Sequence, residues 1–396
     1  MLIIVHCITD EKFFSCIFEE FEYLNQRCIN HYVLVTKKKI EKYRYIKEEN
    51  HIEQIHPRFF KQFLSKVGCD VVILHNLASL PFEQILSLDK SVLLVWFAWG
   101  FDLYEYVCYK PFITIPHLYH KRTKKLLNSI PLYVIKILCK KIYFSCIESK
   151  VQKSIANVDF FSGIIPMEYH LMKNVPSFRA KPILFRYYEP SYIIDLSLLN
   201  SQPLSGNDIL IGNSASPTNN HLDVFDFLKD LDLGNRKIVV PLSYAGSKSY
   251  IKTVKKIGKK LWGDNFVALD SFIPFDQYTS ILSKCSYRVF GFERQQGMGN
   301  VDLALREGCK VFMFKSSMGY KHFQDLGIQL YGIDDSIIKE ISSPLPCSQI
   351  VKQRTLAITH TQTIDTLNML NGLIDTLVNS IKSKDKMSES SLQYTR

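Results

Sequence analysis

The sequence lacks the two glycine motifs that are typical of the commonest nucleotide-binding proteins. No Gly-x-Gly-x-x-Gly follows the first apolar segment, Leu2–Val5, where the dinucleotide-binding fingerprint would lie. The P-loop pattern Gly-x-x-x-x-Gly-Lys-Ser/Thr does not occur either. A dinucleotide-dependent dehydrogenase and a P-loop kinase are therefore both disfavoured.

Other absences concern metals and membranes. Ten cysteines are present, but none forms a Cys-x-x-Cys pair or lies at zinc spacing from a histidine. We therefore expect no bound metal ion. We also expect the cysteines to be free thiols, as in proteins of a reducing compartment. The N-terminus has no basic flank of a signal peptide, and no uninterrupted apolar run reaches the ~18 residues of a membrane span. The protein is expected to be cytosolic or peripheral to a membrane.

Short apolar segments alternate with helical patterns, which predicts an α/β fold of parallel strands. The length of 396 residues, 46% of them hydrophobic, suits two domains. We expect an N-terminal domain over 1–190, a linker over 191–207, a C-terminal domain over 208–382 that ends in a helix over 348–382, and a disordered tail over 383–396. Predicted strands are 2–5, 31–36, 71–75, 92–97, 159–162, 183–185, 208–211, 237–240, 266–269, 286–290 and 310–314.

The most informative segment is Gly291–Asn300, which lies between a predicted strand and a predicted helix over 301–306. The free N–H groups and the dipole of a helix N-terminus attract an anion, and Gly297 and Gly299 permit close approach of the backbone. Arg294 adds donors that match phosphate oxygens. The segment predicts a nucleotide-diphosphate site, although an ordinary glycine turn between a buried strand and helix fits the same pattern.

Several predicted strands are followed directly by polar or glycine-containing segments. Open parallel sheets bind ligands at the carboxyl ends of their strands, so these segments are expected to line ligand sites. Two such sheets in tandem indicate the GT-B architecture, in which two Rossmann-like domains face each other across a cleft. The segments are His75-Asn76, Trp99–Asp102, Gly212–Ser214, Pro241–Tyr244 and Glu293–Asn300.

Charge is concentrated in residues 110–153, which hold ten Lys or Arg against one acid, Glu148, and are rich in Leu, Ile, Tyr and Phe. This composition favours a helix on an anionic membrane surface. A core helix with a solvated lysine face and a nucleic-acid groove are the alternatives. No known nucleic-acid-binding signature is present, so we expect no nucleic-acid partner.

Four motifs occur in one order and together resemble the TDP-N-acetylfucosamine:lipid II N-acetylfucosaminyltransferase family. They are Trp96–Glu105, Ile209–Ser214, Val239–Tyr244 and Arg294–Gly299. The resemblance extends over residues 70–330 and is best over 208–315. The family's His-Gly loop is His75-Asn76-Leu77 here, so we expect a related donor and an acceptor that can differ.

The resemblance implies a metal-independent glycosyltransferase of GT-B fold without a cofactor. It implies a TDP-activated 6-deoxy-amino sugar, similar to N-acetylfucosamine, as donor and an undecaprenyl-diphosphate-linked saccharide as acceptor. It also implies peripheral attachment to the cytoplasmic face of the bacterial inner membrane. The product would belong to a surface polysaccharide, O-antigen or enterobacterial common antigen. A non-catalytic nucleotide-sugar-binding or assembly protein at the membrane face is the alternative.

The candidate site residues lie in these motifs and in the segments that follow the predicted strands, except Glu189, which lies near the linker and has a solvent-facing position as its alternative. Asp102 is the first candidate for a catalytic base, which is needed only if the reaction inverts, and His75 is the second. A helix N-cap and a packed core histidine are the respective structural alternatives. Candidates for acceptor binding are Trp99, Gly100 and Glu189. Candidates for donor binding are Gly212, Asn213, Ser214, Tyr244, Glu293, Arg294, Gln295, Gln296, Gly297, Gly299 and Asn300.

Overall fold

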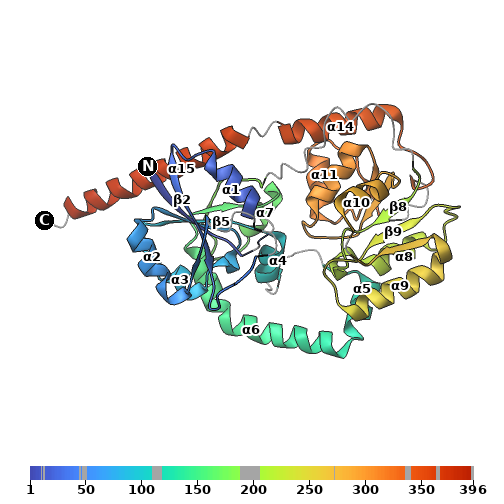
Figure 1. The fold of residues 1–396 in the computed structure, drawn as a ribbon, viewed down its shortest axis with the longest axis horizontal. Coiled ribbons are helices and arrows are strands. Elements are labelled where there is room, and N and C mark those ends of the chain that lie inside the picture. The colour runs from blue at the N-terminus through green and yellow to red at the C-terminus, as the bar shows by residue number, and fades with distance from the viewer. Residues whose placement is uncertain are drawn as a thin grey trace. The chain divides into compact units, whose positions relative to one another are not determined.

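The computed structural model of the chain divides into two compact units (Figure 1). Unit 1 comprises Met1–Thr114, Lys141–Pro190 and Ile364–Arg396, and unit 2 comprises Ile115–Lys140 and Ser191–Thr363. The structure describes residues 1–9, 11, 14–43, 46, 51–108, 118–187, 206–271, 273–334, 340–362 and 366–393. Most of the predicted linker therefore lies outside the described residues.

Unit 1 is built on a parallel seven-stranded sheet with the order β3-β2-β1-β4-β5-β6-β7. After β1 the chain adds β2 and β3 on one side of this strand and then β4 to β7 on the other. The carboxyl ends of β1 and β4 therefore form the topological switch point. The strands are β1 Leu2–Cys7, β2 Cys28–Val35, β3 Ile52–Ile55, β4 Val71–Leu74, β5 Leu93–Phe97, β6 Phe160–Ser162 and β7 Lys181–Pro182.

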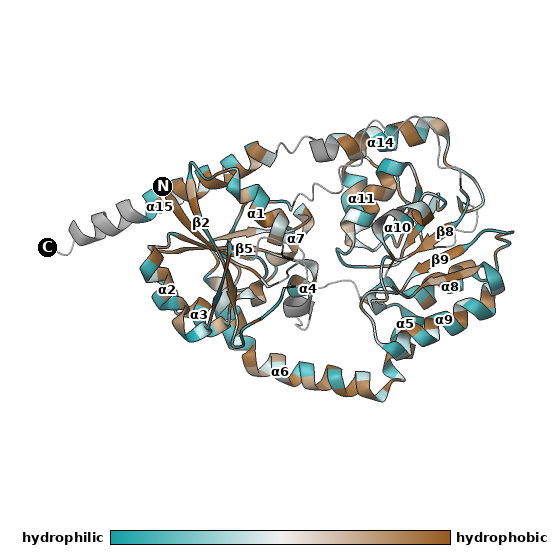
Figure 2. Cartoon of the chain, viewed as in Figure 1, coloured by the Kyte–Doolittle hydropathy of each residue, from teal (hydrophilic) through white to brown (hydrophobic). Residues whose placement is uncertain are grey.

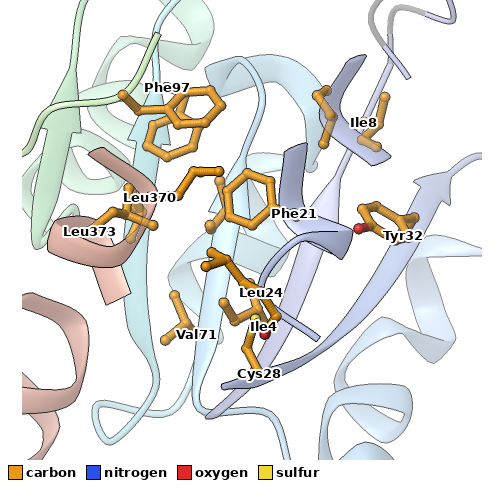
Figure 3. Close-up of a cluster of buried hydrophobic side chains, with 14 of the residues drawn as sticks. Ile4, Ile8, Phe21, Leu24, Cys28, Tyr32, Val71, Phe97, Leu370 and Leu373 are labelled. Carbon is orange, nitrogen blue, oxygen red and sulfur yellow. Dashed lines mark hydrogen bonds between the residues drawn. The ribbon is translucent and has the colours of Figure 1, made fainter. Parts of the chain in front are cut away.

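Alternate residues of these strands form the core of unit 1, because successive side chains point to opposite faces of a sheet. Ile4 and Val71 on the sheet pack with Phe21 of α1 and with Leu370 and Leu373 of α15 (Figure 3). The helices of unit 1 are α1 Phe14–Glu22, η3 Pro57–Phe59, α2 Phe60–Val67, η4 Leu77–Ser79, α3 Phe82–Leu86, α4 Gly100–Cys108, α7 Pro166–Met172 and α15 Thr366–Gln393.

Unit 2 is built on a parallel six-stranded sheet with the order β10-β9-β8-β11-β12-β13. Its switch point is the carboxyl edge of β8 and β11. The strands are β8 Ile209–Ile211, β9 Ile238–Pro241, β10 Phe266–Leu269, β11 Tyr287–Phe290, β12 Lys310–Met313 and β13 Tyr331–Gly332. The helices are α5 Lys121–Asn128, η7 Pro217–Asn219, α8 His221–Leu228, α9 Lys248–Trp262, η8 Gly263–Asn265, α10 Phe275–Leu282, α11 Met298–Glu307, α12 Met318–Asp325 and α14 Cys347–Gln362.

The helix α6 Pro131–Ala156 contributes residues to both units, since residues up to Lys140 belong to unit 2 and those from Lys141 to unit 1. With α5 it makes up most of the described part of the basic segment 110–153; residues 110–117 lie outside the described ranges. No helix in the described ranges is both long and apolar enough to cross a membrane.

The α/β fold with two parallel sheets is confirmed, but three local predictions are wrong. The short strand of unit 1 predicted over 183–185 lies at Lys181–Pro182. The edge strands β3 and β13 were not expected, because Ile52–Ile55 carries polar residues and β13 is only two residues long. The helix predicted over 301–306 begins at Met298, directly inside the glycine loop.

The predicted domain organisation also differs from the structure. Residues 115–140 group with unit 2, and the closing helix expected over 348–382 is two helices, α14 in unit 2 and α15 in unit 1. The polar tail expected to be disordered continues α15 to Gln393, because no glycine or proline follows Gly372 to end the helix.

Arg27 explains why α15 belongs to unit 1. Its guanidinium donates to the side chain of Asn371 (2.6 Å) and to Asp375 (2.5 Å), while Leu370 and Leu373 are buried on the sheet. These contacts join residues about 350 positions apart in the chain, so no local sequence pattern indicates them.

We expect Leu370→Ala to lower the free energy of unfolding of unit 1 by about 2–5 kcal/mol, because it leaves a cavity in a fully buried site. Leu367→Ala, on the same helix but half exposed, should cost about 0.5 kcal/mol or less. Urea unfolding followed by tryptophan fluorescence in a Trp262→Phe background, which leaves Trp96 and Trp99 of unit 1, measures both. Equal losses would show that α15 is not part of this core.

Candidate active site

Two loops meet at the switch point of unit 2. The first, 212–220, follows β8, and the second, 291–297, follows β11, the neighbouring parallel strand. The side-chain amide of Gln296 donates to Asn213 Oδ1 (3.3 Å), and Thr218 Oγ1 donates to Gln296 Oε1 (2.5 Å). The structure therefore brings together the donor-site residues that the sequence predicted in separate motifs.

Two of these glycines are required by the backbone. Gly212 (φ +72°) and Gly297 (φ +57°) lie in the left-handed region that other residues rarely adopt. A Cβ on Gly297 would lie 2.6 Å from Asn213 Nδ2, so a side chain there would push the loops apart. Gly212 and Gly297 are thus needed for the backbone conformation of the two loops.

The N-terminus of α11 has the features of an anion site. Gly297 is its N-cap and gives no side-chain hydrogen bond to the helix, so the first amides, Met298 and Gly299, have no acceptor within the helix. Gly299 is exposed, and a Cβ there would meet no atom within 4 Å. Arg294, partly buried in the same loop, supplies a positive charge. Asn300 is less available, because its N–H already donates to Gly297 O (2.9 Å).

The remaining donor candidates differ in exposure. Gln295, Gln296 and Ser214 are buried. Gln296 joins the two loops through Asn213, whereas Ser214 accepts from Asn219 within the first loop. Tyr244 follows β9 and is 62% exposed, with its carbonyl oxygen accepting from Ala215 N (2.8 Å). Tyr244 is the most exposed of these residues, and an exposed aromatic ring suits stacking on a planar group.

Glu293 has a partner that the sequence motifs did not indicate. His120 Nε2 lies 2.5 Å from Glu293 Oε1, and the imidazole stacks on Phe314 with ring centroids 3.8 Å apart. Glu293 is almost fully buried, while the His120 side chain is 31% exposed. His120 directly precedes α5 and lies far from the glycine loop in the sequence. Its place in the basic segment 110–153 is the sequence signal that could have drawn attention to it.

Asn220 fixes the position of His120. Its Oδ1 accepts from His120 N (2.9 Å), and its amide donates to Gly291 O (2.7 Å) in the glycine loop. The residue itself adopts φ +49°, and its side chain makes no hydrogen bond that caps α8. The amides of Arg122 and Thr123 are instead capped by Asp223 of α8.

His75 lies at the switch point of unit 1, directly after β4. Its Nδ1 lies 2.8 Å from Tyr187 Oη, and its Nε2 lies 3.1 Å from Nδ1 of the buried His6. Burial lowers the pKa of His75 well below its ordinary value and lowers that of His6 to about 3. Both ring nitrogens of His75 have partners within hydrogen-bond distance, which matches the packed-histidine alternative better than a general base.

Asp102 is buried in the first turn of α4 and accepts four hydrogen bonds. The donors are Trp99 N (2.7 Å), Leu103 N (2.8 Å), Leu77 N (2.6 Å) and Trp96 Nε1 (2.8 Å). Because the donors occupy both oxygens, the geometry favours the helix-capping alternative over the predicted base. The carboxylate ties α4 to η4, the turn after β4.

Two of the three acceptor-site candidates, Trp99 and Gly100, lie within the described residues. The Trp99 ring stacks on Tyr187 (4.4 Å between centroids), so one of its faces is already covered, and Gly100 is buried at the start of α4. Glu189 lies outside the described residues. In the described ranges, no three His, Cys, Asp or Glu side chains form a group that could hold a metal ion.

We expect Asp102→Asn to destabilise unit 1 by about 1–3 kcal/mol at pH 7, because an amide cannot accept all four hydrogen bonds and leaves buried donors without a partner. Asp89→Asn, at an exposed carboxylate that accepts from Ser91, is the control and should cost little. Thermal unfolding measures both. A variant that keeps its stability would favour the catalytic role instead.

The same variant has a defined pH dependence. Burial raises the pKa of Asp102 to about 6 from an ordinary value of 3.8. Between these values the folded protein keeps a proton that the unfolded chain has released. The stability of the native chain relative to Asp102→Asn should therefore fall as the pH rises through this window and stay constant above it. A difference that does not change between pH 4 and pH 7 would contradict the shift.

Comparison with known proteins identifies the family and the fold of the chain. The family described as 4-alpha-L-fucosyltransferase glycosyl transferase group 56 matches residues 141–358, more than half of the chain. Among solved structures, Anabaena HepE in complex with UDP and glucose has a TM-score of 0.59 at 12% identity, over 96% of this chain and 99% of that one. Sucrose-phosphate synthase from Thermosynechococcus elongatus has a TM-score of 0.58 at 10% identity, over 99% and 100%.

Identities this low show the fold alone. The fold is GT-B, as the tandem parallel sheets predicted from the sequence indicate.

Proposed function

Because the chain belongs to the 4-alpha-L-fucosyltransferase family, glycosyl transferase group 56, we propose that it transfers a TDP-activated 6-deoxy-amino sugar, similar to N-acetylfucosamine. The acceptor would be an undecaprenyl-diphosphate-linked saccharide of a bacterial surface polysaccharide, O-antigen or enterobacterial common antigen. The observation that carries the donor half of this proposal is the open N-terminus of α11 at the switch point of unit 2.

The chemistry of the donor explains this choice. As the bond between the sugar and the diphosphate breaks, negative charge develops on the diphosphate. The amides of Met298 and Gly299, the helix dipole and Arg294 stabilise that charge, and no metal is needed for the role. Tyr244 offers its exposed ring to the nucleobase. UDP in the HepE complex is consistent with a nucleoside diphosphate in this fold.

We expect TDP to bind the purified protein more tightly than UDP or GDP in calorimetric titrations without metal. Arg294→Ala should weaken TDP binding about 10- to 100-fold, the value of one charge-assisted hydrogen-bonding group. Arg179→Ala is the control, because this exposed arginine lies in unit 1 and bonds only carbonyl groups of its own segment among the hydrogen bonds described.

Each outcome has a defined meaning. Preference for UDP would keep the glycosyltransferase and reject the TDP donor. TDP binding without transfer to lipid II, the acceptor of the family that the sequence resembles, would favour a non-catalytic binding or assembly protein. No binding of any of the three nucleotides would reject the donor site.

We further propose that α6 attaches the protein to the cytoplasmic face of the inner membrane. Leu132, Ile135 and Ile142 are 79%, 55% and 65% exposed, and the exposed Cys139 and Cys146 continue the same stripe. Their spacing of three and four residues places them on one face of the helix. Brown apolar and teal polar residues both mark α6 in Figure 2.

The lysines beside this apolar stripe indicate that the surface it contacts is anionic. At about 100° per residue, Lys136 and Lys140 lie along one edge of the stripe, and the preceding α5 adds Lys121, Lys124 and Lys125. Exposed apolar side chains bordered by lysines are typical of helices that lie on anionic lipid. A lipid-linked acceptor would be reached from this position without a membrane span.

We expect the triple variant Leu132→Ser, Ile135→Ser, Ile142→Ser to lose at least about 100-fold in binding to phosphatidylglycerol vesicles, because three apolar side chains no longer enter the lipid. TDP binding should not change. Val351→Ser, at a half-exposed position of α14, is the control and should sediment with vesicles as the native chain does. Equal sedimentation of the triple variant would reject α6 as the attachment site.

A further inference from the structure

The His120–Glu293 pair is built differently from a surface ion pair. Glu293 Oε1 accepts from Ser316 Oγ (2.7 Å) and faces His120 Nε2 at 2.5 Å. The second oxygen, Oε2, is buried and has no hydrogen-bond partner among the described residues. A purely structural contact would be expected to satisfy both oxygens of a buried carboxylate, so this one invites a functional explanation.

The ring of His120 is held in one orientation. Phe314 covers it at an interplanar angle of 18°, and Asn220 fixes the backbone on which it stands. Since the same Asn220 also binds Gly291 O, the imidazole and the glycine loop share one support. A group positioned in this way loses little entropy when a reaction needs it.

The contact with Glu293 decides which nitrogen is available. With Nε2 donating to the carboxylate, Nδ1 carries the free lone pair, and Nδ1 has no hydrogen bond among the described residues. The side chain is 31% exposed, so a ligand can reach it. A buried carboxylate that fixes the orientation and tautomer of an imidazole is the arrangement of a general base with its orienting group.

We propose that His120 is the proton acceptor of the sugar transfer and that Glu293 is its positioning residue. This inference rests on the proposed function. The acceptor hydroxyl gives its proton to Nδ1 of His120 while its oxygen forms the new bond to the anomeric carbon. The bond from that carbon to the diphosphate breaks, its electron pair leaves with TDP, and the anomeric configuration inverts. Asp102 and His75 then have structural roles.

The test compares His120→Gln with His31→Gln. His31 also faces a glutamate, Glu53 (3.4 Å), but within the β2–β3 pair of unit 1, so its loss removes a His–Glu contact away from the donor edge. Transfer from TDP-N-acetylfucosamine to lipid II is measured together with TDP binding. We expect kcat of His120→Gln to fall about 10²- to 10⁴-fold with TDP binding unchanged, and His31→Gln to match the native chain.

Glu293→Gln provides a second readout that a structural role would not move. Removing the carboxylate takes away the acceptor that fixes the tautomer of the imidazole, so kcat should fall while KM and TDP binding stay unchanged. Product analysis by NMR should show inversion. If His120→Gln fails to fold, Glu293→Gln still tests the inference.

Three results would overturn the inference while leaving the proposed function intact: native turnover in His120→Gln, native kcat in Glu293→Gln, or a product of retained configuration. A native chain that neither binds TDP nor transfers sugar would instead reject the proposed function, and this inference with it.

Discussion

The donor edge of unit 2 depends on the buried side chain of Asn220. A non-glycine residue at φ +49° is strained by about 1–2 kcal/mol, so its surroundings must hold it there. Its amide and carbonyl groups do so by bonding Gly291 O (2.7 Å), Leu118 O (3.1 Å) and His120 N (2.9 Å). One side chain thereby joins the glycine loop, the start of α8 and the segment that carries His120. The geometry of both the anion site and the His120–Glu293 pair follows from this junction.

The two switch points differ in what they leave open. In unit 2 the loops end in the first amides of α11, which have no acceptor within the helix, and in the exposed Tyr244. In unit 1 the corresponding residues satisfy one another: His75 bonds Tyr187 and His6, and Asp102 accepts four donors. The polar residues of unit 1 near β4 and β5 therefore stabilise the loops, whereas the charged residues to which we assign the proposed transfer, Arg294, Glu293 and His120, lie in unit 2.

Most of the fold was predictable because buried parallel strands are continuous apolar runs. Strands such as Val71–Leu74 and Lys310–Met313 are buried at every residue and were found close to their true bounds. The edge strand Ile52–Ile55 was missed because one face of it meets solvent and its sequence is partly polar. The place of α15 could not be predicted, because it depends on Arg27 and on core residues of unit 1 at the opposite end of the chain.

The sequence by itself determined the glycine loop, the positive charge of the 110–153 segment and the succession of parallel strands, since these are properties of neighbouring residues. Only the tertiary structure decided which polar residues meet. His120 and Glu293 are 173 positions apart, and they pair because α5 is capped by Asp223 and Asn220 holds the backbone of His120. Asp102 became a helix cap for the same reason: burial and four donors are set by packing, which a strand-loop-helix pattern in the sequence does not specify.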